Sequence, residues 1–368
     1  MLLTESAEFA SFQSKGVLVY IKLNSISLLA CLGLAITAAV PLSAQTKTRT
    51  AVSAKQIAGA SLNDTAALLP SSDAILTVDV KRVLNDALPL FFADDPAALA
   101  DVNAEIQKFK TETGLDPRSF DRVAVGVKFQ FPRQGVITSD MVAIARGTFQ
   151  AGAIVSAGKI AATGKYEEQK YGASTIYIFN LNENVKMLGL VNTRVSQLAV
   201  VAIDKNTLAL GDLNLVKATL DSKKGSQPNA ELIGLASRSP EAFLGFGGNV
   251  PANIADGINF PSDQISQNVK SVRQVYGSAT VAGTQLDVFA SAKTNNPDEA
   301  ASLNDTLIGL KQLGAMVVSQ LKVDQRKLAQ NALENLRIDV AGNEVQLKLS
   351  IPQADLATLM RTVGKKKA

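Results

Sequence analysis

The stretch AVVAIDKNTLALGDLNLVKATL, residues 199–220, decides the fold class, because two short apolar strands, a turn and a helix follow one another. Asp204-Lys205-Asn206 forms the turn, since an Asn-containing segment between alternating apolar runs is a hairpin signal. The stretch LRIDVAGNEVQLKLSIPQADLATLM, residues 336–360, shows the same order around Ala341-Gly342-Asn343. Two hairpins, each followed by a helix, predict an α+β fold of mostly antiparallel sheet packed against helices.

Outward from these hairpins, β-branched runs alternate with segments of helical period. In the first half we expect strands at 74–80, 122–129, 140–146, 175–179, 198–203 and 207–211, and helices at 97–113, 150–162 and 213–220. In the second half we expect corresponding strands that start at Glu241, Gln274 and Leu286, and a helix that opens at Asn296. A duplication explains this correspondence, although shared strand composition explains part of it as well.

These patterns divide the chain into tandem modules. Its 368 residues suffice for about two domains of ordinary size. The polar, alanine-rich segment after the N-terminal apolar stretch indicates a flexible leader, and the segment from Ser222 to Asn229 has the composition of a linker. We therefore expect a signal peptide at 1–44, a leader at 45–64, a first α+β module at 65–222, a second at 230–362 and a basic tail at 363–368.

The N-terminus has the order of a secretory signal peptide: Lys22, an apolar run at 26–40, and the small-residue end Leu42-Ser43-Ala44. We expect cleavage between Ala44 and Gln45, and an exported, periplasmic or cell-envelope location. The alternative is an uncleaved inner-membrane anchor at 26–44, although this run is shorter than the roughly 20 apolar residues that span a bilayer. Cys31 has a lipobox-like context, but most of the apolar run follows it, so we interpret it as an ordinary signal-peptide residue.

Composition excludes several chemistries. The chain has no histidine, which rules out Ser-His-Asp triads, imidazole acid–base catalysis and histidine-bound metals. Cys31 is the single cysteine, so a chain cleaved after Ala44 has no disulfide and no thiolate chemistry. Tryptophan is absent and basic residues are dispersed, with net charge +4, so we expect no nucleic-acid partner. We expect no cofactor and no metal, and membrane contact through the N-terminal segment only.

The residue patterns that remain compatible with catalysis or ligand binding after these exclusions are short and unspecific. Ser156 and Lys159 have the Ser-x-x-Lys spacing of penicillin-binding enzymes, which places an amine one helical turn from a hydroxyl. Ser319 and Lys322 match equally well, and solvated helix residues explain both pairs. The adjacent carboxylates Asp94-Asp95 and Glu167-Glu168 would bind a cation only if the fold gathered more ligands. The glycines of Gly245-Phe246-Gly247-Gly248 lack the spacing of a dinucleotide fingerprint.

The two helices expected at 298–321 and 323–336 have apolar residues at helical spacing. Packing against the sheet explains this pattern, and a groove for a partner or a lipid is the alternative. The partner itself is unknown from the sequence, and a protein is one candidate.

Three short motifs add a resemblance: Leu69-Pro70-Ser71-Ser72-Asp73-Ala74, Thr113-Gly114-Leu115-Asp116-Pro117-Arg118 and Ile144-Ala145-Arg146-Gly147-Thr148-Phe149. Their pattern, Leu-Pro followed by Thr-Gly-x-Asp-Pro and Arg-Gly-x-Phe, resembles a family of uncharacterised exported bacterial proteins. The resemblance covers the first module and implies no activity.

Taken together, these features favour an exported cell-envelope protein that binds or scaffolds rather than catalyses. Two alternatives stay open. One is a hydrolase that uses serine, lysine or carboxylates; the other is a carrier that holds an apolar ligand between the modules.

Overall fold

The computed structural model describes residues 62–133, 136–187, 191–222, 229–252, 262–321 and 323–364. Its elements up to residue 222 are α2 (Leu62–Ala66), β1 (Ala74–Asp79), α3 (Val80–Arg82), η1 (Val83–Ala87), α4 (Leu88–Phe91), α5 (Pro96–Thr113), η2 (Pro117–Ser119), β2 (Phe120–Arg133), β3 (Val136–Gly147), α6 (Ala151–Ala161), β4 (Tyr166–Tyr171), β5 (Ser174–Met187), β6 (Val191–Asp204), β7 (Thr207–Gly211) and α7 (Leu213–Ser222). The later elements are α8 (Ala230–Ala236), β8 (Leu244–Asn249), α9 (Asp263–Ser271), β9 (Gln274–Ala282), β10 (Gln285–Lys293), α10 (Pro297–Val318), α11 (Val323–Asn335), β11 (Leu336–Ala341), β12 (Glu344–Pro352) and α12 (Gln353–Gly364).

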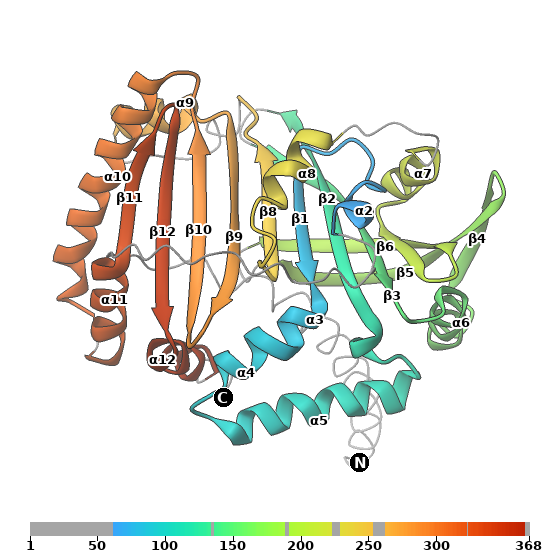
Figure 1. Ribbon diagram of the computed structural model, residues 1–368. Coiled ribbons are helices and arrows are strands. Elements are labelled where there is room, and N and C mark those ends of the chain that lie inside the picture. Colours follow the sequence, from blue (N-terminus) through green and yellow to red (C-terminus); the bar gives the residue numbers. More distant parts are fainter. Residues whose placement is uncertain are drawn as a thin grey trace, which may run out of the picture.

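The described strands form one 12-stranded sheet in the order β11-β12-β10-β9-β8-β1-β2-β3-β7-β6-β5-β4 (Figure 1). Neighbouring strands pair antiparallel, and helices pack on the sheet, so the predicted α+β class is confirmed. Strands β1 and β8 form a central seam, in which Thr77 lies opposite Gly245. We call β2 to β7 the first wing and β9 to β12 the second wing.

Each strand of the seam presents side chains alternately to two faces of the sheet. Ile75 and Thr77 point to one side, face A, and Leu76 and Val78 point to the other, face B. Helices α2, α7 and α8 cover face A, where they bury one apolar cluster against the seam and the first wing. That cluster contains Ala66, Leu69, Ile75, Ala124, Val142, Ile144, Ile176, Ile178, Ala199, Val201, Ala209, Val216, Leu232, Ile233 and Ala236.

Face B is covered along both wings. In the first wing α6 packs over Val123, which lies opposite Val78 in the sheet. At the seam and in the second wing, η1, α4 and α12 bury Val83, Leu90 and Leu356 against Leu286. Helix α10 closes the outer part of the second wing, where Leu303 packs with Val345. In Figure 1 the strands β9, β10 and β12 show face A without a described helix in front of them.

The two halves of the chain exchange helices across the seam. Segment 83–90, which follows β1, packs with Phe243 and Leu286 of the second half. Helix α8, from the second half, packs with Ile75 and Ala124 of the first. The buried Asn229 side chain accepts a hydrogen bond from the Ser72 N–H (3.0 Å) and donates to the Pro70 carbonyl oxygen (2.7 Å). These contacts unite the halves in one body.

The structure adds detail to the expected module boundaries. Helix α2 begins at Leu62, before the expected start of the first module at Thr65, and α12 continues to Gly364. The strand expected from Glu241 begins at Leu244, because the chain turns just before it, where the Ala242 N–H donates to the Ser239 carbonyl oxygen (3.0 Å). The Glu241 side chain forms an ion pair with Arg82 (2.8 Å). The expected duplication stays a prediction, because the wings differ in strand number and in the face that their last helices cover.

Candidate functional site

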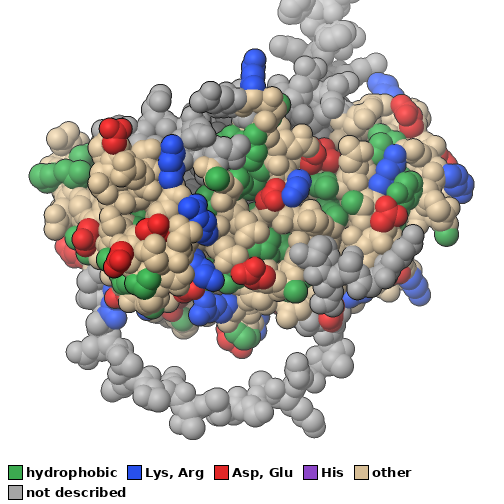
Figure 2. Space-filling view, turned by 90° about the horizontal axis from the view of Figure 1, so that it is seen from above, with side chains coloured by type: hydrophobic (Ala, Val, Ile, Leu, Met, Phe, Trp, Pro, Cys, Tyr) green, Lys and Arg blue, Asp and Glu red, His purple; other side chains and the backbone are tan. Residues whose placement is uncertain are grey.

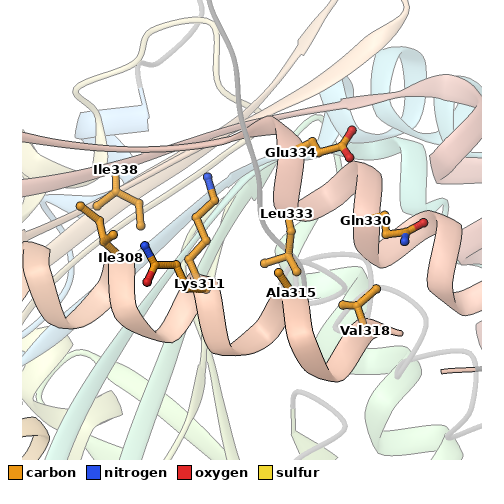
Figure 3. Close-up of a pocket in the computed structure, with 9 residues that line it drawn as sticks. Ile308, Lys311, Ala315, Val318, Gln330, Leu333, Glu334 and Ile338 are labelled. Atoms are coloured by element: carbon orange, nitrogen blue, oxygen red, sulfur yellow. The ribbon is translucent and has the colours of Figure 1, made fainter. Parts of the chain in front are cut away.

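A groove of about 580 Å³ lies between α10, α11 and β11, at the outer border of the second wing (Figure 3). Its apolar side chains come from all three elements and its polar side chains come from the two helices. The lining residues are Ile308, Lys311, Gln312, Ala315, Val318, Gln330, Leu333, Glu334 and Ile338.

The start of α10 is set by local polar contacts. The Asn296 side chain caps the helix by accepting a hydrogen bond from the Glu299 N–H (2.9 Å), and Pro297 occupies the first turn. The Glu299 carboxylate accepts in return from the Asn295 N–H (3.0 Å). These contacts direct the helix along the edge of the sheet, where the buried Ala300 and Leu303 anchor its first half.

The second half of α10 packs against α11. A Cβ at Gly314 would lie 3.4 Å from the Leu333 side chain, so glycine at this position allows close approach of the two helices. Val318 is buried at the end of α10, whereas Ala315 is exposed beside it in the groove. The groove is therefore an open furrow with an apolar floor of Ile308, Val318 and Leu333.

Lys311 is the cation among the groove's lining residues. Its Nζ donates a hydrogen bond to the Leu336 carbonyl oxygen (3.1 Å), at the point where α11 ends and β11 begins. Burial lowers the pKa of the Lys311 amine, because partial removal from water disfavours its charged form. In Figure 3 its amine extends away from the α10 backbone into the space between Ile338 and Leu333. Lys311 thus places a positive charge over an apolar floor.

The opposite side of α10 is apolar and exposed. Leu310, Leu313, Met316 and Val317 are between 41% and 61% exposed, although they are large hydrophobic residues. They do not line the groove. Leu310, Leu313 and Val317 are spaced by three to four residues and Met316 lies three residues after Leu313, which places all four along one side of the helix. We call these four residues the outer stripe.

The candidate catalytic pair of α6 is not assembled for catalysis. The Ser156 hydroxyl donates to the Gly152 carbonyl oxygen (2.9 Å) within the helix. The Lys159 Nζ forms an ion pair with Glu168 (2.8 Å), whose carboxylate raises the pKa of the lysine. A general base would need the opposite shift. The amine also lies 4.9 Å from the Tyr177 ring centroid, so Lys159 connects α6 to the sheet.

The paired carboxylates serve local structure. Asp95 caps α5 by accepting from the Ala98 N–H (3.0 Å), and Asp94 accepts from Gln353 (3.0 Å) on α12. Glu167 and Glu168 alternate along the edge strand β4. Among the described residues, no group of three or more acidic, histidine or cysteine side chains could hold a metal ion.

A polar cluster that sequence patterns did not predict lies on face A of the second wing. The buried Tyr276 hydroxyl donates to Glu344 on β12 (2.7 Å) and accepts from Arg238, whose guanidinium lies 4.9 Å from the tyrosine ring centroid. Burial raises the pKa of Tyr276. The three residues are about 40 and 70 positions apart along the chain, so local periodicity could not have revealed them.

Several sequence expectations lie outside the described residues: the signal peptide with Cys31, the cleavage position at Ala44 and Gln45, Lys322 and the tail lysines. Ser319, the partner proposed for Lys322, donates to the Met316 carbonyl oxygen (2.8 Å). Across the part of the chain that the structure describes, helices fall short of the length and apolarity needed to cross a membrane. Figure 2 shows basic side chains interspersed with acidic ones over one face.

Comparisons with known proteins assign no family to this chain. No protein-family model and no curated protein sequence matches the chain. Solved structures of the treponemal protein TP0453 match in three crystal forms, with TM-scores of 0.41, 0.39 and 0.40 and 10% sequence identity. They cover 81%, 81% and 83% of this chain and 98%, 96% and 99% of TP0453. Likenesses of this extent transfer no function to the chain.

Proposed function

We propose that this protein is an exported, non-enzymatic binding protein of the cell envelope, and that its groove holds the apolar chain of an anionic amphiphile such as a fatty acid. The observation that supports the proposal most strongly is the combination of an open apolar furrow with the amine of Lys311. The signal-peptide pattern before Gln45 supports export. The ligand site lies within the second half of the chain, whereas the sequence suggested a carrier site between the modules.

The size and lining of the groove suit one apolar chain. Small-molecule pockets commonly measure about 300–1,000 Å³ and combine an apolar lining with a few polar groups, and the volume of about 580 Å³ lies in that range. Burial of one methylene contributes about 0.8 kcal/mol. Ten buried methylenes would contribute about 8 kcal/mol before the cost of association, so net affinity in the micromolar range or weaker is expected.

Lys311 gives the proposed site its preference for a ligand with a negatively charged head group. Its partial burial disfavours an unpaired ammonium, and an anionic head group would compensate that cost by forming an ion pair. Gln312 and Gln330, on the two helices, add amide groups that could bond the same head group. Glu334, the carboxylate among the lining residues, would repel an anionic head group, so a carboxylate or phosphate would have to lie beside Lys311 and away from Glu334, with its chain over Val318 and Leu333.

Binding is favoured over hydrolysis by the partners of the candidate catalytic residues. The Lys159 amine pairs with Glu168, and the Ser156 hydroxyl with a helix carbonyl, so neither activates the other. The groove itself contains no serine, threonine or cysteine among its lining residues.

Titration with a fluorescent fatty acid, dansylundecanoic acid, tests the proposal. Ala315→Trp fills the furrow with an indole and should weaken binding at least about tenfold, which corresponds to about 1.4 kcal/mol. Leu313→Trp adds the same ring to the outer stripe and serves as the matched control, with binding unchanged. Circular dichroism establishes that both variants fold. Lys311→Met should bind a dansyl fatty amide as well as the wild type does, yet lose preference for the acid. Equal affinity of Ala315→Trp and wild type, or no binding by either, would contradict the proposal.

A further inference from the structure

Strand β4 is an open edge of the sheet in the first wing. It ends the strand order, and among the described strands it pairs with β5 alone (Figure 1). Its six residues, Tyr166–Tyr171, are half-buried or exposed. An edge strand presents a row of unpaired backbone N–H and C=O groups, which is a template for pairing with another chain. The edge of β4 can therefore accept one further strand.

The turn that follows β4 determines which residues direct their backbone groups to the open edge. Tyr171 and Ser174 lie opposite each other and flank the two-residue turn Gly172-Ala173. Residues that flank such a turn form a hydrogen-bonded pair, and bonded and non-bonded pairs alternate along an antiparallel ladder. Gln169 and Glu167 therefore also direct their backbone groups to β5. The residues that direct their N–H and C=O groups to the open edge are Tyr166, Glu168 and Lys170.

The charges of β4 favour one way of self-pairing. If two copies of the strand pair antiparallel around a twofold axis at Gln169, Glu168 of each copy lies opposite Lys170 of the other. Opposite charges directly across a strand pair stabilise it, and like charges destabilise it. Moving the axis by one residue places Glu168 opposite itself or Lys170 opposite itself. Charged side chains on an edge discourage indiscriminate pairing, and here they also select one register.

The side chains that would form these ion pairs are exposed and only partly engaged. Glu168 pairs with Lys159 through Oε1 (2.8 Å), which leaves its Oε2 for a second cation. The Lys170 Nζ donates a hydrogen bond to the Thr175 hydroxyl (2.9 Å), and it has no carboxylate partner within the described part of the chain. Both side chains lie on face B, so a second copy would meet them side by side.

The other charges near this edge do not oppose the pairing. On face A, Glu167 of one copy would lie opposite Tyr171 of the other. The Tyr171 hydroxyl donates to Asp221 (2.8 Å), and the Lys217 amine lies 5.7 Å from its ring centroid, so one charge of each sign accompanies it. The segment from Lys165 to Tyr171 contains two acidic and two basic residues. Net repulsion between two copies of the strand is therefore small.

From these observations we propose that two copies of this protein pair through β4, antiparallel and around Gln169, and form a dimer in which the two sheets are continuous. The proposal goes beyond ligand binding and does not depend on it, because the groove lies at the opposite border of the sheet. A pair of six-residue edge strands is smaller than a standard protein interface. We therefore expect weak association that depends on concentration.

Cysteine crosslinking of the full chain tests the register. With Cys31→Ser the chain contains no cysteine, so a newly introduced one reports on its own position. Gln169→Cys should form an intermolecular disulfide on mild oxidation, because opposite residues of a non-hydrogen-bonded pair have Cα atoms about 4.5 Å apart. Glu167→Cys, on the same strand and face, is the matched control. Its two copies would lie roughly 14 Å apart and should not crosslink. Non-reducing electrophoresis measures both.

Charge reversal tests the ion pairs by analytical ultracentrifugation. Lys170→Glu places two carboxylates opposite each other at two positions of the dimer and should weaken association at least about tenfold. Adding Glu168→Lys exchanges the charges and should restore association to within about threefold of wild type. Circular dichroism establishes that each variant folds.

Three results would overturn the proposal. The first is a wild-type chain that stays monomeric up to millimolar concentration. The second is equal crosslinking of Gln169→Cys and Glu167→Cys, which would indicate a different register or random contact. The third is a dimer that Lys170→Glu leaves unchanged. Loss of that dimer in Met316→Glu would then place the contact on the outer stripe instead.

Discussion

The two wings of the sheet follow the same strand order outward from the seam, yet they are covered differently. The first half runs β1-β2-β3-β7-β6 and the second runs β8-β9-β10-β12-β11, and β5 and β4 extend only the first. Helix α7 follows β7 onto face A, where Val216 is buried. Helix α12 follows β12 onto face B, where Leu356 is buried. A similar strand order therefore does not determine which face of the sheet a helix covers. In the second half, α10 and α11 lie at the outer border of the sheet, where the groove is open to solvent.

Strand length accounts for part of this difference. Strand β7 has five residues and ends at Gly211, whose φ of +150° and close approach to the Met141 carbonyl oxygen require glycine. The chain turns there into α7. Strand β12 has nine residues and ends at Pro352, and α12, which follows it, contacts α4. The longer strand β12 places α12 on face B beside α4, which belongs to the first half of the chain.

The seam should be the most sensitive part of the molecule. A Cβ at Gly245 would lie 1.9 Å from the Ala236 carbonyl oxygen of α8, and backbone cannot move aside cheaply. Gly245→Val should cost about 3 kcal/mol or more and loosen both wings together. Gly234→Ala, on α8 with open space around its Cβ, is the control and should stabilise by about 0.5–1 kcal/mol. Urea unfolding followed by circular dichroism measures both. Equal stability of the two variants would show that α8 does not hold the seam.

Equivalent core deletions in the two wings test whether they unfold as one body. Leu208 in the first wing and Leu286 in the second are each 2% exposed. Leucine-to-alanine changes at these positions should each cost about 2–5 kcal/mol, and each should shift one common transition, because the halves exchange helices at the seam. Differential scanning calorimetry of the full chain measures the transitions. Two separate transitions, each moved by only one of the variants, would show that the wings are independent domains.

Sequence patterns predicted much of this architecture and missed particular elements for physical reasons. The hairpin at 199–211 and the helix from Gln353 were placed correctly, because periodicity and turn residues are local signals. Strand β4 was missed because Glu167, Glu168 and Lys170 break its apolar alternation, as is common for an edge strand. The β1–β8 pairing joins residues more than 160 positions apart, and no local pattern reveals it.

The sequence predicted only part of the candidate site. Apolar spacing at 298–321 predicted a helix that packs or binds, but it could not separate the groove side from the outer stripe. That separation depends on where α11 crosses α10, next to Gly314. The catalytic role suggested for Ser156 and Lys159 depended on spacing alone, and Glu168 reaches Lys159 from a strand nine residues away.

The smallest predicted effect concerns Lys311. Its pKa lies below the ordinary value of 10.5 because burial disfavours the ammonium, and the Glu334 carboxylate across the groove does not reverse this. The folded pKa is thus lower than the unfolded one, so the cost of burying the charge is present at neutral pH and disappears as pH rises toward 10.5. Lys311→Met should therefore gain stability relative to wild type at pH 7, by about 0.5 kcal/mol or less, and the gain should shrink by pH 10. Urea unfolding at both values measures it. A gain that increases with pH would contradict this cause.

The proposal that the ligand binds in the groove between α10, α11 and β11 is tested most directly by photo-crosslinking. The full chain, incubated with a fatty acid that carries a diazirine in its chain, is irradiated, digested and mapped by mass spectrometry. We predict adducts on α10 and α11, around Ala315 and Leu333, and their loss in Ala315→Trp. Adducts that concentrate on α6 or elsewhere in the first wing, or that persist unchanged in Ala315→Trp, would contradict the claim.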